Sequence, residues 1–178
     1  GGGLVYNSPS GCGCAFPVRA GVALVPVSED LYWARPASKP QPHLARGPAY
    51  GTKASTSDTK ADWPSYRHDA ARTNVSAVPM PAQLSSKWNT DLPGQLTAPV
   101  IAGGLVLTAS SDHSVYALDS SSGAVKWKYT TEGEIWAPPA YWRGMVYVGS
   151  QDGWVYCLRA RDGELVWRFR GAPLDRKM

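Results

Sequence analysis

Residues 96–130 read LTAPVIAGGLVLTASSDHSVYALDSSSGAVKWKYT, and the pattern returns forty residues later, over 136–170, as WAPPAYWRGMVYVGSQDGWVYCLRARDGELVWRFR. Ten of the 35 aligned positions are identical. They are Pro99/Pro139, Gly104/Gly144, Val106/Val146, Ser110/Ser150, Asp112/Asp152, Val115/Val155, Tyr116/Tyr156, Leu118/Leu158, Gly123/Gly163 and Trp127/Trp167. A β-rich repeat of about forty residues is typical of β-propeller blades.

Each copy divides into four short strands separated by turn residues. The expected strands are 96–101, 105–109, 114–119 and 124–129 in the first copy, and 135–141, 145–149, 154–159 and 164–169 in the second. Glycines before the second and fourth strands suit tight turns with positive φ. The predicted fold is all-β, with four-stranded antiparallel, W-shaped propeller blades at 96–130 and 135–170 that make up an incomplete ring.

A tryptophan recurs on the last strand of each copy. Alternate residues of a strand face opposite ways, so Trp127 lies on the packed side while Lys126 and Lys128 face solvent. Trp88, 39 residues before Trp127, indicates the same strand of a third, incomplete copy. A large planar side chain in each blade can bury a wide area against the next blade. The predicted blade-docking residues are Trp88, Gly123, Trp127, Gly163 and Trp167.

The run Tyr116-Ala117-Leu118-Asp119, followed by Gly123 and Trp127, resembles the PQQ-like β-propeller repeat, named after the quinoprotein alcohol dehydrogenases. The second copy departs from that repeat, because Arg159 stands at the acidic position. The segment 62–72, DWPSYRHDAAR, is similar to the lead-in of such propellers in large bacterial proteins, especially of planctomycete type. The resemblance implies a fragment of a larger propeller protein of the periplasm or cell envelope.

Three kinds of function are compatible with this resemblance. The first is a non-catalytic binding or scaffold module, similar in kind to the lipoprotein scaffold of outer-membrane β-barrel assembly. The second is part of a quinoprotein dehydrogenase that uses PQQ and calcium. The third is a sensor propeller fused to a kinase or methyltransferase domain. We favour the first, and expect no cofactor in this fragment, because no catalytic arrangement is recognisable in it; fold alone does not choose among them.

The remainder of the chain predicts a division into three parts. Residues 1–33 resemble a diverged terminal blade of a preceding propeller, since Leu24 and Trp33 repeat the nine-residue spacing of the later copies. Residues 34–60 have the proline, serine and threonine composition of a linker. Residues 61–178 are expected to begin a PQQ-like propeller, with the lead-in and two blades.

Cys12 and Cys14 form an unusual Gly-Cys-Gly-Cys motif. We consider three roles: a disulfide or thiol pair that stabilises a loop, a metal or redox pair, and two inert thiols. Zinc sites usually need a second ligand pair, which favours a structural role, with Cys12 and Cys14 as a candidate disulfide. Cys157 replaces Ala117 of the first copy and is expected to act as a small apolar residue.

The resemblance implies protein partners or the rest of the chain's own propeller. The net charge of +4 arises partly from Lys and Arg on expected outer strands, where they discourage edge pairing, so we predict no nucleic-acid partner. No apolar run reaches about 18 residues, so no membrane span is predicted. Asp112 and Asp152 are interpreted as turn residues. His43, His68 and His113 have no recognisable catalytic partner in the sequence, and no metal ligands are assigned.

Overall fold

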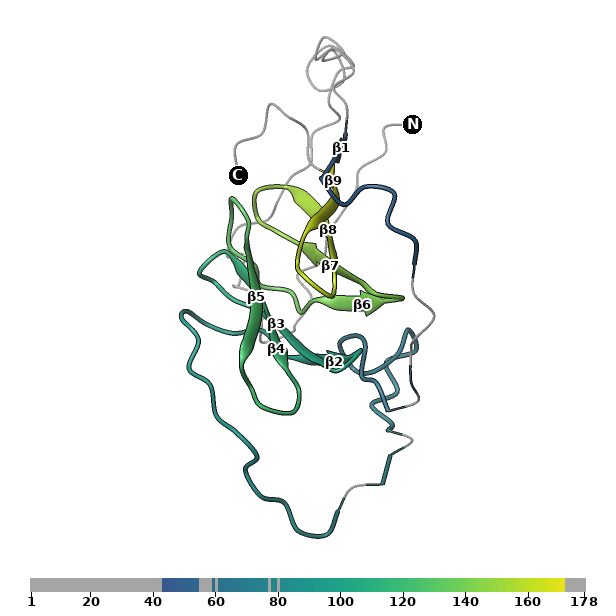
Figure 1. Ribbon diagram of the computed structural model, residues 1–178, viewed down its shortest axis with the longest axis vertical. Coiled ribbons are helices and arrows are strands. Elements are labelled where there is room, and N and C mark those ends of the chain that lie inside the picture. Colours follow the sequence, from purple (N-terminus) through teal and green to yellow (C-terminus); the bar gives the residue numbers. More distant parts are fainter. Residues whose placement is uncertain (1–42, 55–58, 60, 77, 80, 172–178) are drawn as a thin grey trace, which may run out of the picture. The chain divides into compact units, whose positions relative to one another are not determined.

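The described part of the chain folds into two antiparallel β-sheets that pack against each other (Figure 1). The computed structural model describes residues 43–54, 59, 61–76, 78–79 and 81–171. The first sheet contains, in order, β2 (Val100–Ala102), β3 (Leu105–Ala109), β4 (Ser114–Asp119) and β5 (Val125–Thr130). The second contains β6 (Ala140–Trp142), β7 (Met145–Gly149), β8 (Trp154–Arg159) and β9 (Leu165–Arg170), with β1 (Leu44–Arg46) beside β9. Within these ranges no helix is long and apolar enough to cross a membrane.

The two sheets repeat the same strand pairing, which confirms the predicted propeller blades. Leu107 pairs with Ala117 in the first sheet, and Tyr147 pairs with Cys157 in the second. Both sheets also shift register at the same point, immediately after Ala117 and after Cys157. The first strand of each blade is shorter than predicted, beginning directly after Pro99 or Pro139, because proline has no N–H to give to a ladder.

The core fills the space between the two sheets. Its main members are Leu105, Leu107, Val115 and Ala117 from the first sheet and Val146, Val148, Tyr156 and Leu158 from the second. Within each strand these are alternate residues, so they share one face. By the repeat, Leu105, Leu107 and Ala117 of the first sheet correspond to Met145, Tyr147 and Cys157 of the second. These three residues lie on the face of the second sheet that points away from the shared core. The two sheets therefore pack through opposite faces and stack in the same orientation, as successive propeller blades do.

The lead-in contacts the first strand of both blades. Trp63 forms an antiparallel bridge with Ile101 of β2, with N···O distances of 2.6 and 2.9 Å. The carbonyl oxygen of the next residue, Pro64, accepts a hydrogen bond from the amide of Tyr141 on β6. The Trp63 ring also packs edge-on against His68. The lead-in thus pairs with backbone that would otherwise be an open sheet edge.

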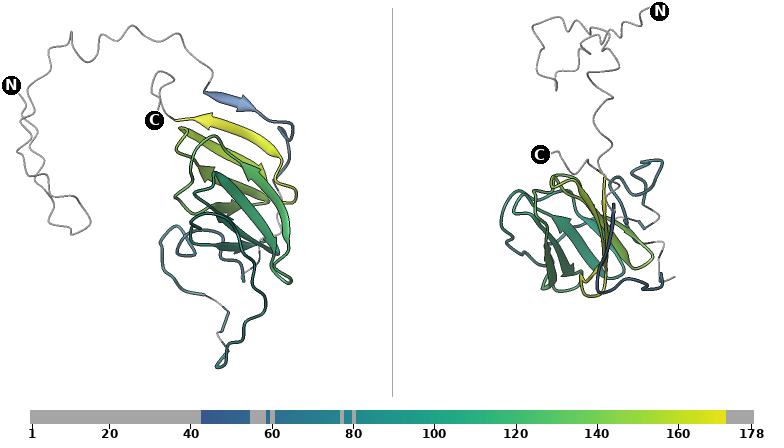
Figure 2. Two further views of the ribbon diagram at one scale, coloured as in Figure 1. Left: turned by 90° about the vertical axis from the view of Figure 1, so that its left-hand side faces the viewer. Right: turned by 90° about the horizontal axis from the view of Figure 1, so that it is seen from above.

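A strap, defined as residues 43–54, adds to the outer edge of the second sheet. β1 pairs antiparallel with β9, as Figure 2 shows, and the amides of Gly47 and Ala49 donate to the carbonyl oxygens of Val166 and Leu165. These residues fall within the range 34–60, for which composition predicted a linker. The difference arises because the strap is held mainly by backbone hydrogen bonds, which leave little trace in sequence. Residues 1–33, with Cys12 and Cys14, lie outside the described residues.

Candidate functional site

Trp88 contacts the turn between β4 and β5. Its indole Nε1 donates to the carbonyl oxygen of Ser120 at 3.2 Å, and its ring lies against Gly123. The hydroxyl of Thr90 donates to the carbonyl oxygen of Gly123 at 2.7 Å. The segment that precedes the first blade therefore holds the outer turn of that blade.

Trp127 makes the same contacts with the second blade. It projects from β5, is 8% exposed, and donates from Nε1 to the carbonyl oxygen of Ala160 at 2.7 Å. Its ring lies against Gly163 in the turn between β8 and β9. The structure therefore brings the predicted docking residues together as pairs, a tryptophan of one unit with a glycine of the next.

Both contacts require glycine for two physical reasons. The φ angles of Gly123 and Gly163 are +73° and +74°, a region that L side chains rarely adopt. A Cβ at Gly123 would lie 2.5 Å from Cδ2 of Trp88, and one at Gly163 would lie 2.6 Å from Cε3 of Trp127. Real carbon contacts are ordinarily near 3.5–4.0 Å, so a side chain would displace the indole.

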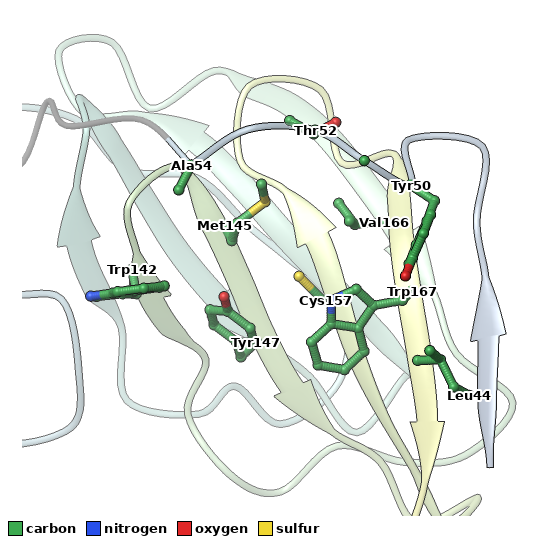
Figure 3. A pocket seen from close by; sticks show the side chains of 11 residues that line it. Leu44, Tyr50, Thr52, Ala54, Trp142, Met145, Tyr147, Cys157, Val166 and Trp167 are labelled. Carbon is green, nitrogen blue, oxygen red and sulfur yellow. The ribbon is translucent and has the colours of Figure 1, made fainter.

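Trp167, the third predicted docking tryptophan, lies in a different setting. Its ring contacts Tyr147 with centroids 6.0 Å apart, and both side chains line a groove between the second sheet and the strap (Figure 3). Within the described part of the chain, no acceptor bonds its indole Nε1, and no glycine packs on its ring as Gly163 does on Trp127.

The groove has a volume of about 360 Å³ and is mostly apolar. Trp142, Met145 and Cys157 line it on the side of the sheet, and Tyr50 and Thr52 line it on the side of the strap (Figure 3). Cys157 is only 1% exposed, and burial raises the pKa of its thiol to about 11. This thiol is therefore protonated at neutral pH and behaves as an apolar group, as the sequence predicted.

Arg159 links the strap to the turn that contains Gly163. Its guanidinium donates to the carboxylate of Asp162 at 2.7–3.0 Å, pairs with Glu164, and reaches the hydroxyl of Thr52 at 3.4 Å. The hydrogen bond from Arg159 holds the pKa of Asp162 below its ordinary value. In the first blade the same position is Asp119, which accepts hydrogen bonds from the turn itself. An arginine at position 159, where the repeat has an acidic residue, was the one feature of the sequence that could have indicated this link.

Asp112 and Asp152 are engaged within their own blades. Asp112 accepts hydrogen bonds from the Tyr116 hydroxyl and the amide of Ser114, and Asp152 accepts from the Tyr156 hydroxyl at 2.6 Å. Burial pushes the pKa of Asp112 upward, but the bond from Tyr116 and the Lys128 ammonium outweigh it and hold that pKa below normal. The turn role predicted for both residues matches this geometry.

The histidines lie on three different segments. His43 Nδ1 is 2.9 Å from the carbonyl oxygen of Arg170, His68 lies against Trp63, and His113 occupies the turn after β3. Among the residues that the structure describes, no group of three or more His, Cys, Asp or Glu side chains could hold a metal ion. Cys12 and Cys14 lie outside this range.

Several solved structures share this arrangement of strands. The quinohemoprotein alcohol dehydrogenase of Comamonas testosteroni is 26% identical, with a TM-score of 0.58 over 66% of this chain and 20% of that one. Quinohemoprotein alcohol dehydrogenase ADHIIG of Pseudomonas putida HK5 is 22% identical, with a TM-score of 0.53 over 65% of this chain and 20% of that one. A europium-containing methanol dehydrogenase is also 22% identical, with a TM-score of 0.53 over 64% and 24%. The chain thus spans a fifth to a quarter of these dehydrogenases.

Comparison of sequences gives the family. No curated protein matches the chain in sequence. A family model described as outer membrane protein assembly factor BamB matches residues 47–176, which is well over half of the chain and includes both blades and most of the strap. The repeat, the stacked sheets and this match agree, and the chain belongs to the PQQ-like β-propeller family that bears the BamB description.

Proposed function

We propose that the chain is a non-catalytic segment of a PQQ-like propeller that serves as a binding or scaffold module of a cell-envelope protein. The observation that carries this proposal is that the repeated aspartate and tyrosine side chains are hydrogen-bonded to each other within their own blades. Asp112 and Asp152 bond to Tyr116 and Tyr156 in their own blades, and burial and the hydrogen bond to Asp152 raise the pKa of Tyr156 far above normal. These hydrogen bonds hold the turn of each blade closed, which is a structural role.

The surface of the molecule supports protein partners. Trp136 and Trp142 are 51% and 54% exposed, and aromatic side chains are enriched at protein interfaces. The outer-strand cations are paired within the molecule: Lys126 with Asp119, Lys128 with Asp112, and Arg168 with Glu132. A nucleic-acid partner would be expected to need unpaired cations in a continuous stripe.

The alternative is a segment of a PQQ-dependent quinoprotein dehydrogenase, favoured by the likeness to the enzyme of Comamonas testosteroni. Calcium takes six to eight oxygen ligands, roughly, including several carboxylates. The described residues hold no cluster of three or more acidic, histidine or cysteine side chains, so under this alternative the carboxylate ligands would lie in other blades. A sensor propeller fused to a kinase or methyltransferase domain remains a third proposal, and its test is the reading frame on either side.

The experiment that separates these proposals is reconstitution of the full-length protein with PQQ and calcium. The scaffold proposal predicts no quinone absorbance and no dye-linked alcohol oxidation, beside a known quinoprotein dehydrogenase as the positive control. Alcohol oxidation that depends on PQQ would overturn it in favour of the dehydrogenase. For the proposed location in the periplasm or cell envelope, cell fractionation should recover the full-length protein there and not in the cytosol.

A further inference from the structure

The turn between β6 and β7 departs from its counterpart in the first blade. There, the turn after β2 begins with Ala102, which is buried, and Gly103. A Cβ on Gly103 would lie 2.9 Å from the hydroxyl oxygen of Tyr141, so the second blade leaves little room for a side chain at this position. The equivalent residues of the second blade are Trp142, which is 54% exposed, and Arg143, which is also exposed. A turn that is small and covered in one blade is therefore large and exposed in the next.

Arg143 also holds a backbone conformation that is costly for any residue except glycine. Its φ angle is +48°, in the left-handed region, whereas its counterpart Gly103 adopts φ +59° at little cost. The guanidinium carbon of Arg143 lies 4.8 Å from the centroid of the Trp142 ring. Non-glycine residues held in this region cluster at ligand-binding and other functional sites. The arginine therefore costs stability at an exposed position, which is typical of a residue retained for binding.

The dipeptide Tyr66-Arg67 in the lead-in is built in the same way. Arg67 has φ +62°, and its guanidinium carbon lies 5.5 Å from the centroid of the preceding Tyr66 ring. Tyr66 is 48% exposed, and Arg67 is also exposed. The amide of Tyr141, next to Trp142, donates to the carbonyl oxygen of Pro64, two residues before Tyr66. This hydrogen bond joins the two segments, so both arginine–aromatic dipeptides belong to one region of the surface.

A third arginine–aromatic pair lies on the strap. The guanidinium carbon of Arg46 lies 4.6 Å from the centroid of the Tyr50 ring, and both side chains are exposed. Trp142 lines the groove from the side of the sheet and Tyr50 lines it from the side of the strap (Figure 3). The groove thus connects the third pair to the β6–β7 turn. The three pairs are called the arginine–aromatic surface: Arg46 with Tyr50, Arg67 with Tyr66, and Arg143 with Trp142.

The arginines of this surface differ from the cations of the outer strands. Among the residues that the structure describes, Arg46, Arg67 and Arg143 lie over aromatic rings and form no ion pair with a carboxylate. The outer-strand cations pair with an aspartate or a glutamate. Arginine, tryptophan and tyrosine are the residues that most often dominate binding energy at protein interfaces. Guanidinium groups without an acidic partner attract carboxylates, which indicates the charge of the partner.

We propose that the arginine–aromatic surface binds an acidic segment of a protein partner. Carboxylates of the segment accept hydrogen bonds from the guanidinium groups of Arg67 and Arg143, and apolar side chains between them pack on Trp142 and in the groove. The inference deepens the proposed scaffold function and rests on it, since it names the chemistry of the partner.

The test measures the binding of a labelled peptide to the full-length protein by fluorescence anisotropy. The probe is a short peptide of glutamate and leucine residues, and its control is the same peptide with glutamine in place of every glutamate. We expect saturable binding of the acidic peptide that weakens as salt is added, because salt screens exposed charges. The glutamine peptide should not bind.

Arg143→Gly separates binding from folding. It introduces the residue that the first blade has at this position, and φ +48° suits glycine. The variant should unfold in urea at a midpoint no lower than that of the parent, while its dissociation constant for the acidic peptide rises about tenfold or more. Arg67→Gln should weaken binding in the same way. Lys87→Gln is the matched control, because it removes an exposed cation from the segment that contacts the first blade, and should change the dissociation constant by less than about twofold.

No saturable binding of the acidic peptide, or equal binding of the glutamine peptide, would overturn the proposal. A parental dissociation constant in Arg143→Gly would overturn it as well, and so would tighter binding of single-stranded DNA, which would indicate a nucleic-acid partner. Peptide binding does not depend on PQQ. Alcohol oxidation beside intact peptide binding would therefore contradict the scaffold function alone, and loss of binding without oxidation would contradict the arginine–aromatic surface alone.

Discussion

The indole nitrogen of Trp127 lies 2.7 Å from the carbonyl oxygen of Ala160, so a side chain of the first blade satisfies a backbone group of the second. The same bond joins Trp88 to Ser120 one step earlier. Each blade is therefore fastened by the unit that precedes it, and stability is expected to depend on these contacts between neighbours.

Trp127→Phe should destabilise the chain because it keeps an aromatic ring and removes the Nε1–H donor. The buried carbonyl oxygen of Ala160 would lose its partner, which costs about 1–2 kcal/mol. Trp167→Phe removes an indole that has no acceptor among the described residues, and should cost less than about 0.5 kcal/mol. Urea unfolding of the two variants measures the difference, and equal losses would contradict the assigned hydrogen bond.

Gly163→Ala should be more damaging than alanine at a glycine with the same backbone angle and open space. Gly104 has φ +75° with nothing within 4 Å of its Cβ position, so Gly104→Ala should cost only about 1–2 kcal/mol of backbone strain. At Gly163 the added carbon also meets the Trp127 ring, which adds about 1–3 kcal/mol. Urea denaturation measures the loss in free energy of unfolding for both variants. Equal losses would show that the Trp127 ring moves aside at no energetic cost.

The blades could be predicted from sequence because the same residue pattern occurs twice. Identical residues such as Gly123/Gly163 and Trp127/Trp167 recur at a fixed offset, and strand alternation assigns their faces. The pairing of Trp127 with Gly163 could not be read directly, because a repeat shows that two positions are equivalent and not which neighbours they contact.

An ordered turn over residues 46–51 is predicted from the sequence, but the strand β1 and the link of the strap to Arg159 were not, for two physical reasons. Three-residue β1 is too short to show alternation, and it is held through backbone groups that any residue carries. Arg159 did stand out as a departure from Asp119, but nothing in the sequence linked this residue to a segment more than a hundred residues earlier.

Tyr116→Phe should raise the pKa of Asp112, because it removes a hydrogen bond to the charged carboxylate. In the parent chain the folded pKa of Asp112 is below 3.8, so its contribution to stability is present above pH 3.8 and is lost as the pH falls through the folded pKa. NMR titration of the Asp112 carboxyl should give a higher midpoint in the variant. Lys87, outside this cluster, offers a neutral control as Lys87→Gln, and an unchanged Asp112 midpoint in Tyr116→Phe would refute the role of Tyr116.

Cys157 should react slowly with iodoacetamide, because the thiolate is the nucleophile and the folded pKa is about 11 against an ordinary 9.0. This difference of two pKa units alone predicts that, near pH 8, Cys157 is alkylated about 100-fold more slowly in the folded chain than in the unfolded chain. The rate should increase about tenfold for each pH unit up to the folded pKa. The measurement uses a background with Cys12→Ser and Cys14→Ser, so that Cys157 is the only thiol.

Arg159→Asp in that background should accelerate the reaction, since it puts a third carboxylate beside Asp162 and Glu164 and removes the link to Thr52. The strap would then open more often, and with it the cover that Ala49 gives to Cys157. Arg161→Asp is the matched control, because Arg161 also pairs with Asp162 but is 75% exposed and does not reach the strap. If both variants alkylate at the parental rate while the fold is kept, Arg159 does not hold the strap, and its backbone ladder with β9 is sufficient.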